Sequence, residues 1–335
     1  IVVAYRMVDP NIFHLLRQKS TTFDFVVVAA VVITAIVYNL IAAAGVGLGL
    51  AILLFLREQI RGTVVRRKAY GNQTFSKKQR LPEEVAVLEQ KGAQTAICEL
   101  QGSLFFGTTD QLFTELEADL KTKKYVILDM RRVQSVDFTA THLLDQIEAQ
   151  LAERKGILIF SHLPPNLPTG QDLQTYFDQV GLVKPTRSVK IFDELDDALE
   201  WTEDRILEDE GLLQAGQETP LSLQEINLVK GFDADTLAAL ASCIEERAYE
   251  PGQKVFQHGD TGDEIFLIRR GTVRIVLPLA GGRQHHIVTF GRGDFFGDMA
   301  FIDHAMRSAD AVACAPTDIY VISRARFDKV AVDHP

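Results

Sequence analysis

Residues 294–311 read DFFGDMAFIDHAMRSADA, and this stretch determines how the last third of the chain is interpreted. A Phe-Gly-acid triplet precedes a short apolar run that predicts a helix, and an Arg-Ser pair follows ten residues after Gly297. Main-chain amides at a helix start and the guanidinium of Arg307 suit a phosphate, and the Asp298 carboxylate can accept from a ribose hydroxyl. The arrangement therefore favours binding of a cyclic phosphate diester.

The residues upstream alternate between short strands and turn glycines. They read EPGQKVFQHGDTGDEIFLIRRGTVRIVL (250–277), and with the stretch above they closely resemble a cyclic nucleotide-binding domain over about 225–331. The resemblance implies an α+β β-roll with flanking helices, and cyclic AMP or cyclic GMP as a regulatory ligand, with no cofactor. We place this domain at 225–335 and expect the lid helix of the family to be missing, because it would begin where the chain stops.

The resemblance also implies a set of nucleotide-binding residues. They are Phe296, Gly297, Asp298, Met299, Ala300, Arg307 and Ser308. Backbone amides around Gly297 would face the phosphate, Arg307 would pair with its exocyclic oxygens, and Ser308 would touch phosphate or base. We expect Phe296 and Met299 to pack in the core rather than to touch the ligand.

Asp298 departs from the family, which usually has Glu at the ribose-contacting position. Asp is one methylene shorter, and a lost charged hydrogen bond costs roughly 1.5–3 kcal/mol. A β-roll that kept its shape and lost its ligand is therefore the alternative. His285 and His286 are adjacent on a predicted strand, point to opposite faces, and are interpreted as ordinary strand residues.

Residues 25–56 contain no charged side chain. As one helix they would span about 48 Å, against a bilayer core of roughly 30 Å, and two full spans need about 40 residues. Arg17 and Lys19 precede the run and a basic cluster follows it, which favours both ends on the cytoplasmic side. We therefore predict a membrane hairpin of two short helices turning near Tyr38 and Asn39, with one tilted, over-long span as the alternative.

Charge divides the chain sharply. Residues 1–80 carry 11 Lys/Arg and 3 Asp/Glu, a net charge of +8, and the other 255 residues carry 24 and 42, a net charge of −18. The acidic bulk argues against nucleic acid as a partner, and the basic excess beside the apolar run indicates a membrane. We assign 1–60 to C-terminal transmembrane helices, in part of a longer protein, and 61–91 to a basic juxtamembrane linker. That linker could contact anionic membrane lipid or could only fix the orientation.

Strands and helices alternate from residue 92 to residue 207, which predicts an α/β domain with a helix-covered sheet. We expect a strand-turn-strand unit at 95–106, and a linker at 208–224. The remaining expected elements are helices at 109–120, 139–153, 172–180 and 193–207 and strands at 125–130, 156–161 and 189–192.

The junction DMRRVQSVDFTATHLL (129–144) places Asp137 where a helix N-cap belongs and Thr139 in the first helical turn. This strand, loop and Val-Asp-x-Thr-Ala start resemble a STAS domain, the module of anti-sigma factor antagonists and of SulP-type anion transporters. The antagonists carry a phosphorylated Ser after this Asp, where this chain has Phe138. Asp137 and Thr139 are thus interpreted as helix-start residues, and regulation by phosphorylation of Thr139 is the alternative.

Three cysteines, Cys98, Cys243 and Cys314, are too far apart for a metal site or a disulfide framework, so no metal is predicted. The order of the segments resembles the C-terminal part of a SulP-type transporter, in a multi-pass membrane protein with both soluble domains in the cytoplasm. The resemblance implies regulation of transport of an inorganic anion such as sulfate or bicarbonate, whose site lies in earlier helices, and a possible homodimer. A membrane-tethered adaptor whose STAS domain binds a partner protein is the alternative, and no catalytic residues indicate an enzyme.

Overall fold

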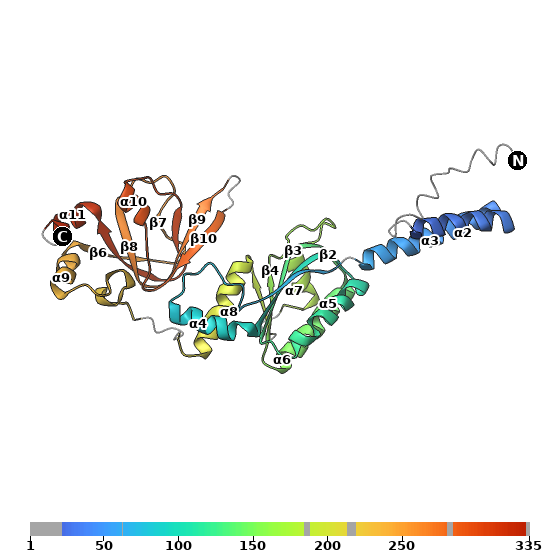
Figure 1. Ribbon diagram of the computed structural model, residues 1–335, viewed down its shortest axis with the longest axis horizontal. Helices are drawn as coiled ribbons and strands as arrows, with labels where there is room; N and C mark the ends of the chain where they lie inside the picture. Colours follow the sequence, from blue (N-terminus) through green and yellow to red (C-terminus); the bar gives the residue numbers. More distant parts are fainter. Residues whose placement is uncertain (1–21, 62, 184–187, 213–218, 280–283, 333–335) are drawn as a thin grey trace.

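The computed structural model of the 335-residue chain describes residues 22–61, 63–183, 188–212, 219–279 and 284–332. A helical hairpin, an α/β domain and a β-roll domain follow one another along the chain and along the long axis of the molecule (Figure 1). The multidomain α/β and α+β organisation predicted from the sequence is thus confirmed. Arg17 and Lys19, on which the predicted orientation of the hairpin rests, lie outside the described residues.

The hairpin consists of α2 (Thr22–Val37) and α3 (Leu40–Arg61). Its turn lies at Tyr38 and Asn39, as predicted, and the Asn39 side chain accepts from the amide of Ala42 at 2.7 Å. The two helices pack closely at Gly47, where an added Cβ would lie 3.0 Å from Val31.

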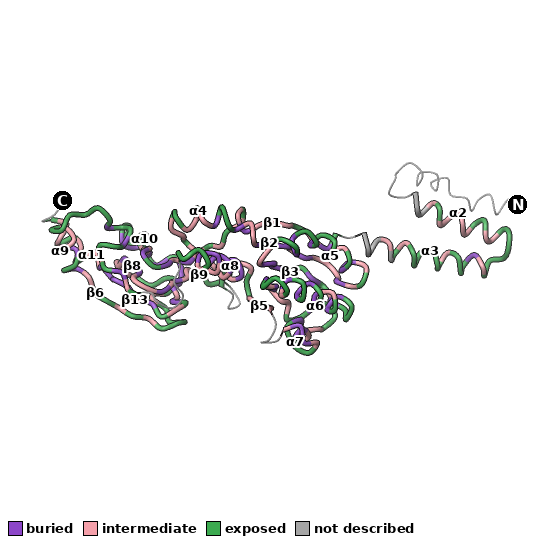
Figure 2. The backbone as a smooth tube through the Cα atoms, turned by 90° about the horizontal axis from the view of Figure 1, so that it is seen from below, coloured by how far each residue is buried: buried purple, intermediate pink, exposed green. Residues whose placement is uncertain are grey.

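Most large apolar side chains of this hairpin are exposed, and Figure 2 shows exposed and partly buried residues alternating along its length. The exposed side chains are those of Val26, Val32, Ile33, Ile36, Val37, Tyr38, Leu40, Ile41, Val46, Leu48, Ile52, Leu53 and Phe55. Within the described part of the chain, however, no helix combines the length and the apolar character needed to cross a membrane. The prediction is therefore supported as a helical hairpin and not as a membrane hairpin.

The α/β domain has one five-stranded sheet with the order β1-β2-β3-β4-β5, in which only β1 is antiparallel to its neighbour. The strands are β1 (Val65–Tyr70), β2 (Thr95–Leu104), β3 (Tyr125–Val136), β4 (Ile157–Ser161) and β5 (Val189–Phe192). The helices are α4 (Pro82–Lys91), α5 (Phe106–Leu120), α6 (Phe138–Glu153), α7 (Leu173–Val180) and α8 (Leu195–Asp209). Helices α5, α6 and α7 bury apolar side chains on one face of the sheet, and α4 and α8 do so on the other.

Two sequence predictions in this region are wrong. The predicted linker 61–91 contains strand β1 and helix α4, because the basic strand Val65–Tyr70 pairs with the edge of the sheet, where Lys68 reaches the buried Asp119 at 2.6 Å. The predicted strand-turn-strand unit at 95–106 is the single strand β2. Gly102 adopts a φ of +75°. No turn forms at this position, and the pairing of β2 with β3 instead shifts its register between Gly102 and Ser103.

The β-roll consists of two four-stranded antiparallel sheets, with the orders β10-β9-β12-β7 and β11-β8-β13-β6. The strands are β6 (Ile244–Tyr249), β7 (Lys254–Phe256), β8 (Glu264–Arg270), β9 (Val273–Pro278), β10 (Gln284–Phe290), β11 (Phe295–Phe296), β12 (Asp310–Ala313) and β13 (Thr317–Ser323). The helices are α9 (Ala234–Cys243), α10 (Asp298–Asp303) and α11 (Arg324–Ala331), preceded by 3₁₀ turns at Leu223–Glu225 and Asn227–Val229. Phe266 and Phe296 belong to the core between the sheets.

Candidate functional site

The predicted nucleotide site begins where β11 ends and α10 starts. Gly297 forms the start of α10 with a φ of +85°, a conformation that side chains rarely tolerate. A Cβ at this position would lie 2.8 Å from Nη1 of Arg307 and 3.1 Å from the carbonyl oxygen of Glu264. Both the backbone conformation and the close approach of Arg307 therefore require glycine.

Arg307 is the central buried charge of this site, with only 4% of its surface exposed. Its Nη1 donates to the carbonyl of Gly297 at 3.0 Å and its Nη2 to the carbonyl of Glu264 at 2.8 Å. The guanidinium lies over the rings of Phe256 and Phe266, at 4.3 and 5.2 Å from their centroids. Guanidinium has five N–H donors, so donors remain to bind an anion.

The electrostatic setting of Arg307 favours such an anion. Burial lowers the pKa of its guanidinium, and the carboxylates of Glu264, Asp263 and Asp260 only partly oppose this effect. Arginine nevertheless stays charged at neutral pH. A desolvated cation of this kind is stabilised by any anion that reaches it.

The other predicted site residues lie around Arg307 in different ways. Asp298 is exposed at the first position of α10, Ser308 is exposed beside Arg307, and Ala300 is buried. Phe296 is buried and stacks on Phe266 with ring centroids 5.0 Å apart, which confirms its predicted place in the core.

The expectation that Met299 packs in the core is wrong, since this residue is 61% exposed. Helix α10 is only six residues long, and its buried residues are Ala300 and Phe301. A helix this short packs only one narrow face against the core, and Met299 does not lie on that face.

Several residues of this site escaped the sequence analysis. Glu264 supplies a carbonyl, Phe256 and Phe266 supply the rings, and a Cβ at Gly262 would lie 3.1 Å from Nη2 of Arg307. The sequence shows the two Phe residues as apolar strand positions and Gly262 as a turn residue. Nothing in that pattern tells which of them faces Arg307.

Asp310 was also missed. Its buried carboxylate accepts from the amide of His258 and from Nζ of Lys254, each at 2.7 Å, and these bonds lower its pKa although burial opposes them. They hold the loop whose residues Gly259 and Asp260 exchange main-chain hydrogen bonds with Arg307, at 2.8 and 2.9 Å. Asp310 thus positions the backbone on which Arg307 depends.

In the α/β domain, the start of α6 confirms the helix-start interpretation. The carboxylate of Asp137 accepts from the amide of Ala140 at 2.7 Å and caps the helix. Thr139 is exposed in the first turn, and Phe138 is 74% exposed. Phosphorylation of Thr139 stays a prediction.

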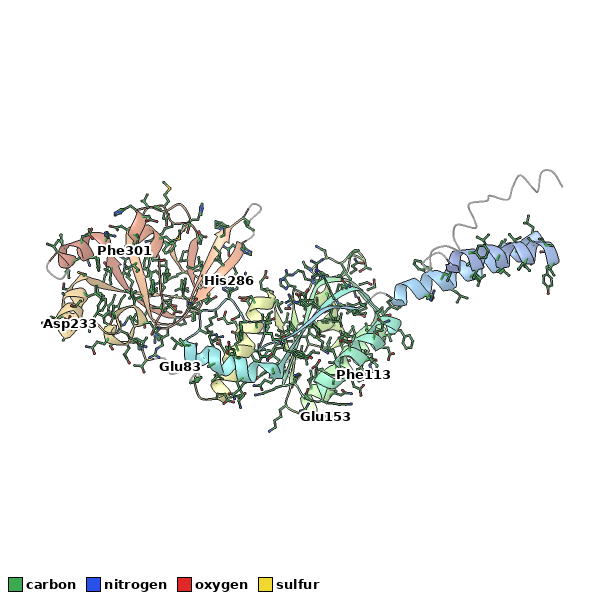
Figure 3. All side chains as sticks on the ribbon, in the orientation of Figure 1. Glu83, Phe113, Glu153, Asp233, His286 and Phe301 are labelled. Atoms are coloured by element: carbon green, nitrogen blue, oxygen red, sulfur yellow. The ribbon has the colours of Figure 1, made fainter. Side chains whose placement is uncertain are left out.

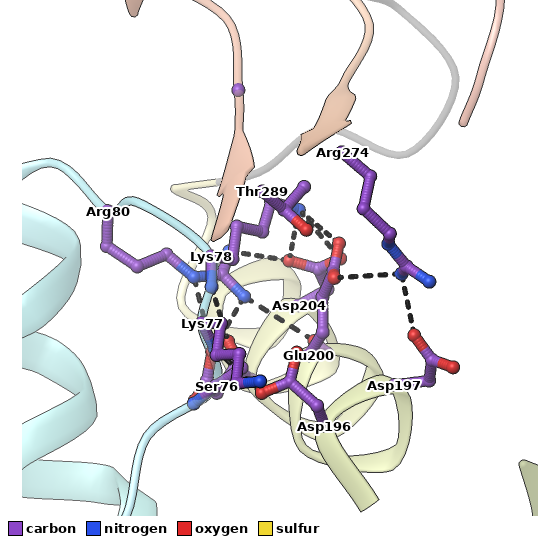
Figure 4. A network of polar contacts seen from close by, with 12 residues as sticks. Ser76, Lys77, Lys78, Arg80, Asp196, Asp197, Glu200, Asp204, Arg274 and Thr289 are labelled. Carbon is purple, nitrogen blue, oxygen red and sulfur yellow. Dashed lines mark hydrogen bonds and ion pairs between the residues drawn. The ribbon is translucent and has the colours of Figure 1, made fainter. Parts of the chain in front are cut away.

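A second concentration of charge joins the two domains (Figure 4). The segment 76–80, which leads from the sheet edge to α4, lies against acidic residues of α8. Arg80 pairs with Glu203 at 2.9 Å and with Asp204 at 2.6 Å, and the side chains of Arg80 and Glu203 are each only 5% exposed. Lys78 pairs with Asp204 at 3.1 Å and with Glu200 at 3.3 Å.

The same segment also contacts the β-roll. The amide of Gln79 donates to the carbonyl of Thr289 at 2.8 Å, and the amide of Thr289 donates to the carbonyl of Lys77 at 3.1 Å, so the segment extends the edge of β10. Arg274 of β9 pairs with Asp197 of α8 at 2.6 Å. We call residues 76–80, the acidic face of α8 and the β9–β10 hairpin the interdomain network.

His286 lies in strand β10, as predicted, and it also belongs to this network. Its Nδ1 lies 3.0 Å from Asp196 of α8, and contact with His286 and with the amide of Lys77 lowers the pKa of Asp196 although burial opposes it. Figure 3 shows His286 on the side of the β-roll that faces the α/β domain, away from Phe301 of α10. His285 beside it is exposed.

Comparison with known proteins identifies both domains. The STAS domain model matches residues 85–198, and the cyclic nucleotide-binding domain model matches residues 246–334. The chain therefore contains a STAS domain and a cyclic nucleotide-binding domain.

Individual relatives match parts of the chain. Glutaminase 2 of Bradyrhizobium diazoefficiens is 28% identical over 72% of this chain and 37% of its own length. The cyclic AMP receptor protein of Thermus thermophilus is 31% identical over 29% of this chain and 45% of its own length. The crystal structure of the Thermus thermophilus catabolite activator protein covers 32% of this chain and 51% of its own, with 29% identity and a TM-score of 0.31. The chain thus spans less than half the length of either curated relative.

Proposed function

We propose that this chain is the regulatory C-terminal region of a SulP-type secondary transporter of an inorganic anion such as sulfate or bicarbonate. In this proposal the β-roll binds cyclic AMP or cyclic GMP, and the STAS domain passes the effect to the membrane part. The region itself catalyses no reaction. The observation that carries the proposal is the interdomain network, in which the β-roll contacts the segment that continues from the hairpin through β1.

The buried Arg307 supports nucleotide binding. It lies beside Gly297 and retains unused donors, as the exocyclic oxygens of a cyclic phosphate require. The name of the Thermus relative supports the same ligand class. Asp298, at the start of α10, is the residue that we assign to the ribose hydroxyl.

The exposed apolar hairpin supports a membrane location. Soluble monomers rarely leave so many large apolar side chains uncovered side by side. Helices too short to span alone are tolerated when a larger membrane bundle surrounds them. The basic residues after α3 then hold the STAS and cyclic nucleotide-binding domains on the cytoplasmic side.

Regulation requires that the nucleotide bind two conformations with different affinity. In this proposal, a ligand bound to Arg307 changes the conformation of the β-roll. The β9–β10 hairpin of the β-roll contacts the 76–80 segment and α8. That segment is six residues beyond the end of β1. A displacement of residues 76–80 can therefore reach the end of α3 through strand β1, which connects the two.

The experiment is anion flux into proteoliposomes that contain the complete transporter, with and without each cyclic nucleotide. We expect the nucleotide to change the flux in the native protein and to leave it unchanged in Arg307→Ala. The control is Arg326→Ala, which removes an exposed arginine from the same domain. Equal nucleotide effects in the native protein and in Arg307→Ala would contradict the proposal.

A membrane-tethered adaptor is the second candidate. The match to a protein named glutaminase favours it, because the shared region there makes up only 37% of the whole, and a portable regulatory unit can serve different partners. Nucleotide binding that alters capture of a partner protein by the STAS domain, without any change of flux, would support the adaptor instead.

A further inference from the structure

Two phenylalanines lie exposed at the same end of the STAS sheet. Leu104 at the end of β2 pairs with Val136 at the end of β3, so the helices that follow both strands start side by side. Phe106 and Phe138 are the first residues of α5 and α6, and each is 74% exposed. Covering a Phe side chain is worth about 1.5–3 kcal/mol, so exposed rings at the starts of two adjacent helices favour a contact surface.

This end of the sheet is also where the hairpin joins the domain. Phe55 of α3 lines one cavity together with Phe105, Arg132 and residues at the end of β2. Just beyond α3, the carbonyl of Thr63 accepts from the Gln101 side chain at 3.0 Å. The exposed rings therefore lie at the end of the sheet where the hairpin joins the domain.

Arginines also lie at this end of the sheet. Arg66, Arg131 and Arg132 line a second cavity at the same end, and all three are exposed. The nearby carboxylates are already engaged by cations or by backbone amides. These carboxylates are Glu99 with Arg66, Asp129 with the amide of Arg131, Asp137 with the amide of Ala140, and Glu194 with His162. Three arginines thus line this cavity against two carboxylates, Glu99 and Asp129, so the cavity lining carries a net positive charge.

We propose that this hairpin-side face, defined as Arg66, Phe106, Arg131, Arg132 and Phe138, docks on the anionic phospholipid surface through which the hairpin enters. The inference rests on the proposed membrane location of the hairpin and adds a second contact with the same leaflet. Each Lys or Arg close to an anionic leaflet contributes about 1 kcal/mol, and apolar rings between basic groups insert at the headgroup boundary.

The test uses the full chain with Cys314→Ser, because Cys98 and Cys243 are buried and Cys314 is exposed. A fluorophore is attached to one introduced cysteine and quenched by brominated lipid, in phosphatidylcholine vesicles with or without phosphatidylglycerol. Thr139→Cys reports on the hairpin-side face and leaves Phe138 intact. Ile36→Cys reports on the hairpin, and Ala238→Cys, exposed on α9 of the β-roll, is the control.

We expect quenching at position 36 in both vesicles, quenching at 139 only with phosphatidylglycerol, and none at 238. Quenching at 139 should be lost in Arg131→Gln/Arg132→Gln and in Phe106→Ser/Phe138→Ser, while position 36 stays quenched. Quenching at 36 but never at 139 overturns this inference and leaves the proposed function intact. A blue shift at 139 without quenching overturns it too, since the face is then covered by protein. No quenching at 36 overturns the proposed membrane location.

Discussion

Two buried arginines illustrate how differently the interdomain network and the nucleotide site are built. Arg80 is enclosed by two carboxylates, whose charges raise its pKa although burial opposes this. Arg307 is equally buried, yet it bonds carbonyl oxygens, and within the described residues it forms no ion pair. Burial lowers its pKa. The first arginine is fully paired within the STAS domain, where it fixes the segment that contacts the β-roll, and the second has donors left for the anion that we propose.

The largest expected effect comes from Arg80→Met. Removing one partner of a buried ion pair typically costs about 3–5 kcal/mol, because the remaining carboxylate stays buried and unpaired. We expect the urea midpoint of the STAS domain to fall strongly and contact with the β-roll to be lost. The control is Lys121→Ala, which removes an exposed ion pair at the C-terminal end of α5. Equal urea midpoints for both variants would contradict a stabilising role for the buried ion pairs of Arg80 with Glu203 and Asp204.

Arg307→Ala tests the other half of the comparison. Two charged hydrogen bonds at about 1.5–3 kcal/mol each predict a loss of nucleotide affinity of about 100-fold or more. Arg307→Lys should recover only part of it, because an ammonium lacks the planar fork. Both affinities are measured by calorimetry, after circular dichroism has shown that each variant is folded. An unchanged nucleotide affinity in Arg307→Ala would show that this arginine does not bind the nucleotide.

Asp298→Glu sharpens the description of the nucleotide site. If the shorter side chain weakens the ribose contact, the longer one should tighten binding by up to about tenfold. Deoxyribose analogues of the nucleotide separate the causes, because they should not distinguish Glu from Asp at this position. Equal gains with ribose and deoxyribose ligands would contradict the assigned contact.

The smallest effect is expected at His162, a half-buried cation in the STAS domain. Burial disfavours its charged form, but the Asp129 carboxylate 3.4 Å away prevails and raises its pKa above 6.5. Its stabilising contribution is therefore complete below pH 6.5 and is lost as the pH rises through the folded-state pKa. Thermal unfolding from pH 6 to pH 9 should show this loss in the native protein and a flatter profile in His162→Gln.

The sequence predicted those features that depend on local chemistry. The hairpin turn at Asn39, the cap at Asp137 and the glycine start of α10 each follow from a few neighbouring residues. The pairing of Gly297 with Arg307 came from the resemblance, which places residues ten positions apart in one site.

Features that depend on distant partners were not predictable in this way. Arg80 meets Glu203 across 123 positions, and nothing near either residue indicates the other. The basic strand β1 has the composition of a linker, and only its place at the sheet edge gives Lys68 a buried partner in Asp119. Phe256 and Phe266, whose rings lie against Arg307, occur in the same apolar sequence pattern as the residues of any other core strand.

The measurement that tests the central claim most directly is calorimetric titration of the chain with cyclic AMP and with cyclic GMP. The account predicts saturable binding of at least one of them at one site per chain, and loss of that binding in Arg307→Ala. A native, folded protein that shows no binding heat and no thermal stabilisation with either nucleotide at millimolar concentration would contradict it.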